Sequence, residues 1–159
     1  VLTESVLRDV LKTDAKRVYE TWLAKCMLGS AMSGSMGFNA QYANIIAALF
    51  IATGQDPAHT VEGSVGITTA EVINGADLYV SIYLPDLMVG TIGGGTGLAT
   101  QKEALGILGV TGGTGGEHAT RFAEIIGATV LAGEISLLSS LEQGTLARAH
   151  SKLARGKII

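Results

Sequence analysis

The segment that most constrains the fold of this 159-residue sequence runs from Asn39 to Gly54. Apart from Asn44, its central part (Ala-Asn-Ile-Ile-Ala-Ala-Leu-Phe-Ile-Ala) carries apolar residues that fall on every side of a helix. A helix that is apolar all round is typical of a protein core. We therefore predict a long buried central helix that ends at Gly54, where glycine can adopt the left-handed conformation of a helix end. The apolar stretch Tyr42–Thr53 is too short to cross a bilayer, and no other membrane segment is predicted.

The hydrophobic period changes twice along the chain. Helical spacing is found before and after the middle, whereas alternation with a period of two is found within it. The Asn74-Gly75 pair between the two alternating runs is typical of a hairpin turn. The expected helices are 2–11, 15–23 with Thr13 as its cap, 98–108, Glu117–Glu142 and Leu146–Arg155; the expected strands are Val65–Thr69, Leu78–Leu84 and a third one beginning at Leu87 and Val89. Helices around a small antiparallel sheet place the chain in the α+β class.

Composition excludes several classes of protein. Hydrophobic residues make up 47% of the chain and the formal net charge is −3, which is unlike a disordered segment. The only cysteine, Cys26, rules out a disulfide scaffold and fits a reducing, cytoplasmic compartment. It does not stand at metal-ligand spacing from the histidines, so no metal site is expected. Stacking aromatic residues do not accompany the basic residues, which argues against nucleic acid as a partner.

Positive charge is unevenly distributed. The chain has no lysine or arginine from Cys26 to Gln101, although five acidic residues lie there. This predicts that much of the middle is buried or meets another protein surface. After Glu142 the bias is reversed, with Arg148, Lys152, Arg155 and Lys157 and no acidic residue. The basic tail is either a solvated helix end or a patch for an anionic ligand.

Four polar side chains have two readings each. Asp56 precedes Pro57, so it either caps a helix or supplies a carboxylate tuned by nearby burial. Lys25 either holds a substrate carboxylate or points to water. The amide of Asn44, on the apolar helix, needs either a side-chain partner or a ligand. His150 is either a surface residue or a general acid, because imidazole titrates near neutral pH.

Glycine accounts for 22 residues and is concentrated in runs that include 90–97 and 112–116. Neither run matches the dinucleotide fingerprint or the Walker motif. Exposed backbone amides at a helix start can approach an anion or a flat ring. The alternative is a glycine turn that only permits tight packing.

Considered together, six segments resemble hydroxymethylglutaryl-coenzyme A (HMG-CoA) reductases, and the archaeal members of class I in particular. The segments, in order and over nearly the whole chain, are Lys25 with Gly29-Ser30-Ala31-Met32-Ser33-Gly34-Ser35, Gly37-Phe38-Asn39-Ala40, Ala43-Asn44-Ile45, Gly54-Gln55-Asp56-Pro57-Ala58, Gly90-Thr91-Ile92-Gly93-Gly94-Gly95-Thr96 and Leu146-Ala147-Arg148-Ala149-His150. The resemblance implies reduction of HMG-CoA to mevalonate and CoA by two hydrides from NADPH. It also implies that the fold is part of the large, substrate-binding domain of these reductases.

The resemblance further implies roles for single residues. The catalytic aspartate falls on Asp56, and the histidine that protonates the departing CoA thiolate falls on His150. Lys25 and Asn44 fall on residues that bind the hydroxymethylglutaryl group. The remaining positions are Val10, Leu11, Lys12 and Ala149 in segments that contact CoA, and Gly93, Gly94, Gly95, Thr96 and Arg155 near the nicotinamide cofactor.

By the same resemblance, residues 1–159 correspond to the C-terminal portion of the catalytic domain. The family's catalytic glutamate, its catalytic lysine and its small NADP-binding domain all precede the first matched residue. We therefore expect the isolated polypeptide to be inactive. The resemblance also implies a homo-oligomer with the active site between subunits. The alternatives are a non-catalytic module that binds CoA or a nucleotide, and a structural fragment that associates with longer chains.

Overall fold

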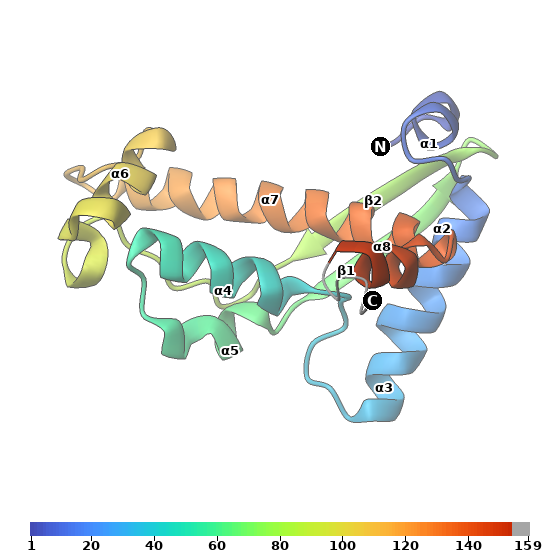
Figure 1. Ribbon diagram of the computed structural model, residues 1–159, viewed down its shortest axis with the longest axis horizontal. Helices are drawn as coiled ribbons and strands as arrows, with labels where there is room; N and C mark the ends of the chain where they lie inside the picture. The colour runs from blue at the N-terminus through green and yellow to red at the C-terminus, as the bar shows by residue number, and fades with distance from the viewer. Residues whose placement is uncertain (154–159) are drawn as a thin grey trace. The chain divides into compact units, whose positions relative to one another are not determined.

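The computed structural model describes residues 1–153, apart from the side chains of Ala149 and Leu153. Helices dominate, and a two-stranded sheet lies in the middle of the chain (Figure 1). The elements are α1 (Glu4–Asp9), α2 (Ala15–Trp22), the π-helix η1 (Leu23–Gly29), α3 (Ser30–Ser33), α4 (Tyr42–Thr53), the 3-10 turn η2 (Pro57–His59), α5 (Thr60–Ser64), β1 (Ile67–Ile73), β2 (Asp77–Tyr83), the 3-10 turn η3 (Gly94–Gly97), α6 (Ala99–Ile107), α7 (Glu117–Glu142) and α8 (Thr145–Leu153). The expected α+β class is confirmed.

The chain divides into two compact units. The first contains residues 1–40, 68–81 and 133–153, and the second contains Gln41–Ile67 and Ile82–Ala132. The start of α7 therefore belongs to the second unit and its end to the first. The length and composition of α7 would also suit a membrane span, but core helices meet the same criteria, so one such helix is weak evidence.

In the first unit, α2, η1 and α3 form one continuous helical rod (Figure 1). Asp14, not Thr13 as the sequence predicted, caps this rod: its carboxylate accepts a hydrogen bond from the Arg17 amide at 3.0 Å. Thr13 is buried, and its hydroxyl is directed to another partner described below. The core side chains are Leu7, Ala15, Val18, Trp22, Cys26, Ala70, Leu78, Val80 and Leu138.

The turn and the second strand of the hairpin lie where the sequence predicted them, but the first strand is Ile67–Ile73 instead of Val65–Thr69, and its buried residues are Thr68 and Ala70, not the alternating Ile67 and Thr69. Asn74 and Gly75 both have positive φ, as a tight two-strand turn requires. Along β1 and β2 burial alternates, and Thr68 and Ala70 on one strand and Leu78 on the other are directed to the core. The N-terminus extends this pairing through an antiparallel bridge between Leu2 and Leu78.

The main core cluster of the second unit is aliphatic and aromatic, and Thr53, Thr91 and Thr96 are also buried in this unit. The fully buried members of the cluster are Tyr42, Ile46, Phe50, Leu105, Val110, Phe122, Ile126 and Val130. Leu87 and Val89 pack against this cluster and do not form the predicted third strand, so their apolar spacing reflects core packing. Pro85 between β2 and these residues also lacks the amide that a strand would donate.

The helix α4 is central to this unit, but the prediction that it is buried on every side is wrong for the chain as described. Tyr42, Ile46, Phe50 and Thr53 are buried, whereas the opposite side is exposed and includes Ile51 at 63%. The exposed side is made mostly of alanine, so the helix is apolar all round without being covered all round.

Candidate functional site

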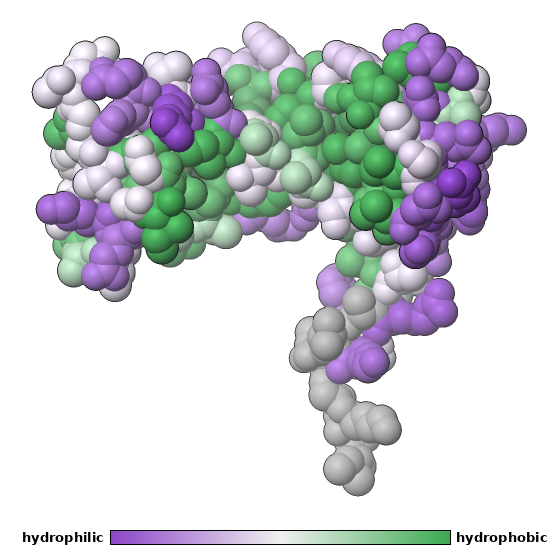
Figure 2. Space-filling model, turned by 90° about the horizontal axis from the view of Figure 1, so that it is seen from above, coloured by the Kyte–Doolittle hydropathy of each residue, from purple (hydrophilic) through white to green (hydrophobic). Residues whose placement is uncertain are grey.

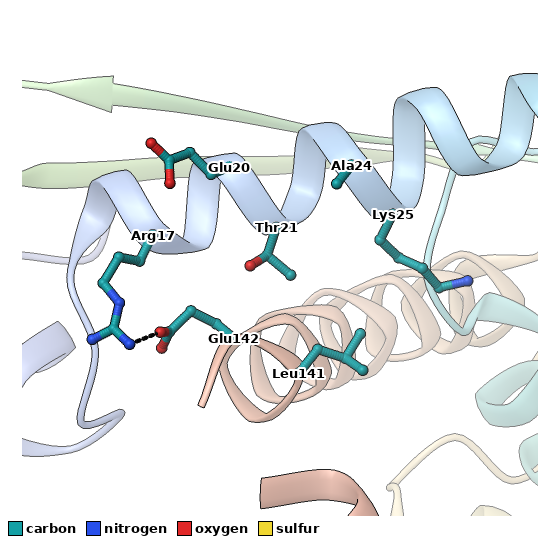
Figure 3. A pocket seen from close by; sticks show the side chains of 7 residues that line it. All are labelled: Arg17, Glu20, Thr21, Ala24, Lys25, Leu141 and Glu142. Atoms are coloured by element: carbon teal, nitrogen blue, oxygen red, sulfur yellow. Dashed lines mark ion pairs between the residues drawn. The ribbon is translucent and has the colours of Figure 1, made fainter. Parts of the chain in front are cut away.

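Lys25 lies in a pocket of about 580 Å³ within the first unit (Figure 3). One wall is the rod α2–η1, which presents Arg17, Glu20, Thr21, Ala24 and Lys25; the other is the end of α7, which presents Leu141 and Glu142. The Lys25 side chain comes from the π-helical part of the rod. Such segments occur often at functional sites, because the widened turn changes which side chains face a neighbour.

The charges in this pocket are not equivalent. Arg17 forms an ion pair with Glu142, whose side chain is only 4% exposed. Glu142 also accepts a hydrogen bond of 2.6 Å from the Thr13 hydroxyl. Lys25, by contrast, makes no hydrogen bond or ion pair within residues 1–153, so its ammonium group is available to a ligand.

Asp56 is held in the second unit by a tightly packed set of turns. Gly54 ends α4 in the left-handed conformation, and a Cβ at this position would lie 2.4 Å from the Gly95 carbonyl. The Gln55 amide exchanges two hydrogen bonds with the backbone of Gly90, at 2.9 and 2.8 Å. These contacts hold the Gly-Gln-Asp motif against the glycine loop. Position 54 must be glycine for this approach, because any side chain there would clash with the loop.

Asp56 and this loop line a second pocket of about 300 Å³. Its other lining residues include His59, Met88, Ile92, Gly93, Gly94 and Thr96. One Asp56 oxygen accepts from the Ala58 amide at 3.0 Å, which confirms the cap. The other oxygen lies 3.8 Å from His59 Nε2. The carboxylate itself is exposed.

The remaining predicted site residues are divided between the units. Asn44 is exposed on α4, so the expectation that burial would force a partner on its amide is wrong. Val10 and Lys12 are exposed and Leu11 is partly buried in the turn after α1. His150 is exposed on α8, and Ala149 precedes it on that helix. Arg155 lies outside the described residues.

The second glycine run forms a further concave surface in the second unit. Thr91 donates to the Gly112 carbonyl at 2.5 Å, and His118 Nδ1 lies 3.1 Å from the Thr111 carbonyl oxygen. A pocket of about 360 Å³ between Gly90–Ile92 and residues 112–116 results. These contacts tie the two glycine runs together, a pairing that spacing along the chain does not reveal.

Glu134 is a buried charged residue that the sequence analysis did not single out. It is fully buried in the first unit, where its carboxylate accepts hydrogen bonds from the Ala40 amide at 2.9 Å and the Thr68 hydroxyl at 2.6 Å. The signal was present, because Glu134 interrupts the apolar side of a long helix. Its carboxylate connects the backbone at Ala40 with Thr68 on β1.

Cys26 lies beside this group and is fully buried. Burial, with a smaller contribution from the Glu134 carboxylate, raises the pKa of its thiol to about 12, while Lys25 acts in the opposite direction. A thiol of this kind is neutral at physiological pH and is a poor nucleophile. Among residues 1–153, no three His, Cys, Asp or Glu side chains are arranged to hold a metal ion.

Comparison with known proteins gives a consistent result. The family model described as hydroxymethylglutaryl-coenzyme A reductase matches residues 1–155. The 3-hydroxy-3-methylglutaryl-coenzyme A reductase of Methanothermobacter thermautotrophicus is 58% identical over 151 residues, covering 95% of this chain and 37% of that protein. The enzyme of the same name from Aeropyrum pernix is 54% identical over 158 residues (98% and 37%), and reductase 2 of Solanum lycopersicum is 45% identical over 160 residues (98% and 27%). The chain thus spans little more than a third of the archaeal relatives.

Proposed function

Because the chain belongs to the hydroxymethylglutaryl-coenzyme A reductase family, we propose that it takes part in the NADPH-dependent reduction of HMG-CoA to mevalonate and CoA. The observation that carries this proposal is the pocket around Lys25. It offers one unpaired ammonium group, beside a Leu141 side chain and next to a small apolar wall at Ala24. That combination suits a short branched acid with a single free carboxylate, which the hydroxymethylglutaryl group is.

Asp56 and His150 supply the proton chemistry in this proposal. Reduction of the thioester first gives a hemithioacetal, which breaks its carbon–sulfur bond to release mevaldehyde and the CoA thiolate. His150 protonates this thiolate, and its exposed position on α8 leaves the imidazole accessible to a large leaving group. Asp56 is held with one carboxylate oxygen engaged by its own cap and the other turned to the pocket, so it is oriented to act on the substrate oxygen.

The glycine loop fits a flat cofactor ring. Gly93 and Gly94 have φ of 82° and 54°, and a Cβ at either position would meet nothing within 4 Å. The glycines here are thus required by the backbone conformation and leave an open surface, in line with the implied proximity of Gly93–Thr96 to the nicotinamide. NADPH would supply hydride at this surface, while the loop and Asn44, which is also exposed in the second unit, would position the reacting groups.

Oligomerisation is part of the same proposal. The exposed alanine-rich side of α4 and the exposed Ile51 and Met88 are unusual for a free surface. Figure 2 shows hydrophobic residues over much of the viewed face. A second copy of the chain is the partner we infer, which agrees with the absence of lysine and arginine between Cys26 and Gln101.

Exchange of Lys25 for alanine tests the proposal in a full-length reductase carrying this sequence. We expect KM for HMG-CoA to rise about tenfold or more, because a charge-assisted hydrogen bond to the carboxylate is lost. Lys16→Ala is the matched control, since Lys16 lies on the same rod and is 80% exposed at its side chain.

The 159-residue polypeptide alone should show no NADPH oxidation, because the resemblance places further catalytic groups in a preceding segment. An unchanged KM, or turnover by this polypeptide near that of the full enzyme, would contradict these expectations.

Exchange of His150 for alanine tests its role as the proton donor. Reduction of HMG-CoA should slow by about 100-fold or more, the usual contribution of a positioned general acid. Reduction of free mevaldehyde should slow much less, because no thiolate leaves in that step. Initial rates of NADPH oxidation with each substrate measure both effects. Equal losses on the two substrates would remove the leaving-group role.

A further inference from the structure

Lys12 occupies the left-handed backbone conformation in the turn after α1. Its φ is 57°, and within residues 1–153 the other non-glycine residue with positive φ is Asn74, in the hairpin turn where this is expected. Two local backbone hydrogen bonds close the Lys12 turn, from the Leu11 amide to the Val6 carbonyl at 3.2 Å and from the Thr13 amide to the Leu7 carbonyl at 3.0 Å. Glycine is the usual residue at such a helix end, so a lysine here carries a steric cost that neighbouring contacts offset.

The end of α7 holds this turn from outside. Glu142 accepts the 2.6 Å hydrogen bond from Thr13 and pairs with Arg17, while Gln143 Nε2 donates to the Leu11 carbonyl at 2.5 Å. These contacts hold both sides of Lys12 from a helix about 130 residues further along the chain. We refer to Glu142 and Gln143 as the clasp. Glu142 is almost completely buried, so water does not weaken its two interactions.

The clasped turn lines a basic pocket of about 450 Å³ in the same unit. Arg8, Lys12 and Arg17 contribute to it, together with Glu4, Thr13 and Asp14. Arg8 is paired with Asp9 at 2.9 Å, and Arg17 with Glu142. Lys12 forms no ion pair within residues 1–153, and its ammonium donates only to the Asp9 carbonyl at 2.8 Å. It is therefore the cation of this pocket with the greatest capacity to bind a phosphate.

Arg17 lines both this basic pocket and the pocket around Lys25. A ligand that enters both needs an anionic carboxylate at one end and phosphates at the other. A CoA thioester of a dicarboxylic acid has this composition.

We propose that Glu142 is a positioning residue that fixes the Lys12 turn for the phosphate-bearing part of the CoA substrate. This inference rests on the proposed function. Glu142 does not contact the ligand in this account; it holds Thr13 and Arg17, and these hold the turn. Without it, the turn keeps only its local backbone hydrogen bonds, and the Lys12 ammonium is held less firmly in the pocket.

The sign of the effect separates positioning from simple electrostatics. Removing an anion from a basic pocket should strengthen the binding of a polyanion if charge alone matters. If Glu142 acts by geometry, its removal weakens binding instead. Glu71→Ala is the matched control, because Glu71 is an exposed acid of the same unit that lines neither of these two pockets.

The test is calorimetric titration of coenzyme A into a full-length reductase carrying this sequence, with Glu142→Ala, Glu142→Gln, Gln143→Ala and Glu71→Ala variants. We expect the Kd for CoA to rise about tenfold for Glu142→Ala and about threefold for each milder variant, as lost charge-assisted or neutral hydrogen bonds predict. Glu71→Ala should leave the Kd unchanged. The Kd for free 3-hydroxy-3-methylglutarate should stay within about twofold for Gln143→Ala, because Gln143 lines neither pocket, and kcat should change less than KM in each variant.

Each other outcome has a distinct meaning. If the unmodified enzyme does not bind CoA, the proposed function is wrong. If it binds CoA and Glu142→Ala binds as tightly or more tightly, the positioning role is wrong and the charge account holds. If Glu142→Ala does not fold, the two milder variants decide, and an unchanged Kd in both overturns the inference.

Discussion

Glu134 and Phe50 are both fully buried, yet one is surrounded by hydrogen-bond donors and the other by carbon atoms. Glu134 belongs to the first unit, where Thr13 and Ser30 are also buried. Phe50 belongs to the second unit, whose fully buried cluster is aliphatic and aromatic. Both units bury apolar side chains and threonines, but among the described residues the buried carboxylate belongs to the first unit. Its hydrogen bonds are directional, whereas the main cluster of the second unit packs by shape and volume. The pocket of Lys25 lies in the unit that contains the buried carboxylate.

Truncation of Phe50 should have the largest effect on stability. Phe50→Ala leaves a cavity in the close-packed core of the second unit and should lower the free energy of unfolding by about 3–5 kcal/mol. Urea denaturation followed by circular dichroism measures the change. Ile51→Ala, on the exposed side of the same helix, should change it by less than about 1 kcal/mol. Similar losses in both variants would show that the two sides of α4 are packed alike.

Removal of Glu134 should have the next largest effect. Glu134→Ala leaves the Thr68 hydroxyl and the Ala40 amide without their buried acceptor, and we expect a loss of about 2–3 kcal/mol. Glu134→Gln retains one acceptor oxygen and should lose less. The same denaturation experiment compares them. If Glu134→Leu is as stable as the unmodified chain, volume rather than hydrogen bonding supports the first unit too.

Titration of Cys26 should have no effect on stability at neutral pH, where the two preceding variants are compared, and should act only under alkaline conditions. The folded-state pKa is raised to about 12, so between roughly pH 9 and 12 the unfolded chain loses this proton and the folded chain keeps it. Stability should then fall as pH rises, by on the order of 1 kcal/mol per pH unit from this group, and be unaffected below pH 9. Cys26→Ala removes this slope whatever its effect on overall stability. An identical alkaline slope in that variant would exclude the thiol as the cause.

Features that depend on local chemistry were predictable from the sequence. Asn74-Gly75 fixes its turn by backbone preference, and Asp56 caps its helix with the amide two residues away. The exposure of one side of α4 could not be predicted, because an apolar side chain shows that burial is favourable but not whether another part of the chain covers it. The clasp was also missed, since Thr13 and Glu142 are ordinary residues until folding brings them within 2.6 Å. The pocket around Lys25 and the basic pocket around Lys12 both depend on such long-range contacts. Lys25 and Lys12 themselves could be named from the sequence, but the walls of their pockets could not.

The π-helix η1 places Lys25 by the number of residues in its turn as well as by their identity. Its hydrogen bonds join residues five apart, one more than in the α-helix on either side. Deletion of one residue between Leu23 and Gly29 would restore regular winding and rotate the rod's two ends relative to each other, so that Lys25 and Arg17 would no longer face a common wall. Homologous chains can therefore vary in composition here, but insertions and deletions within this segment should be strongly disfavoured. The number of residues in this one helical turn therefore determines where Lys25 lies, and only an insertion or deletion, not a substitution, would test its importance.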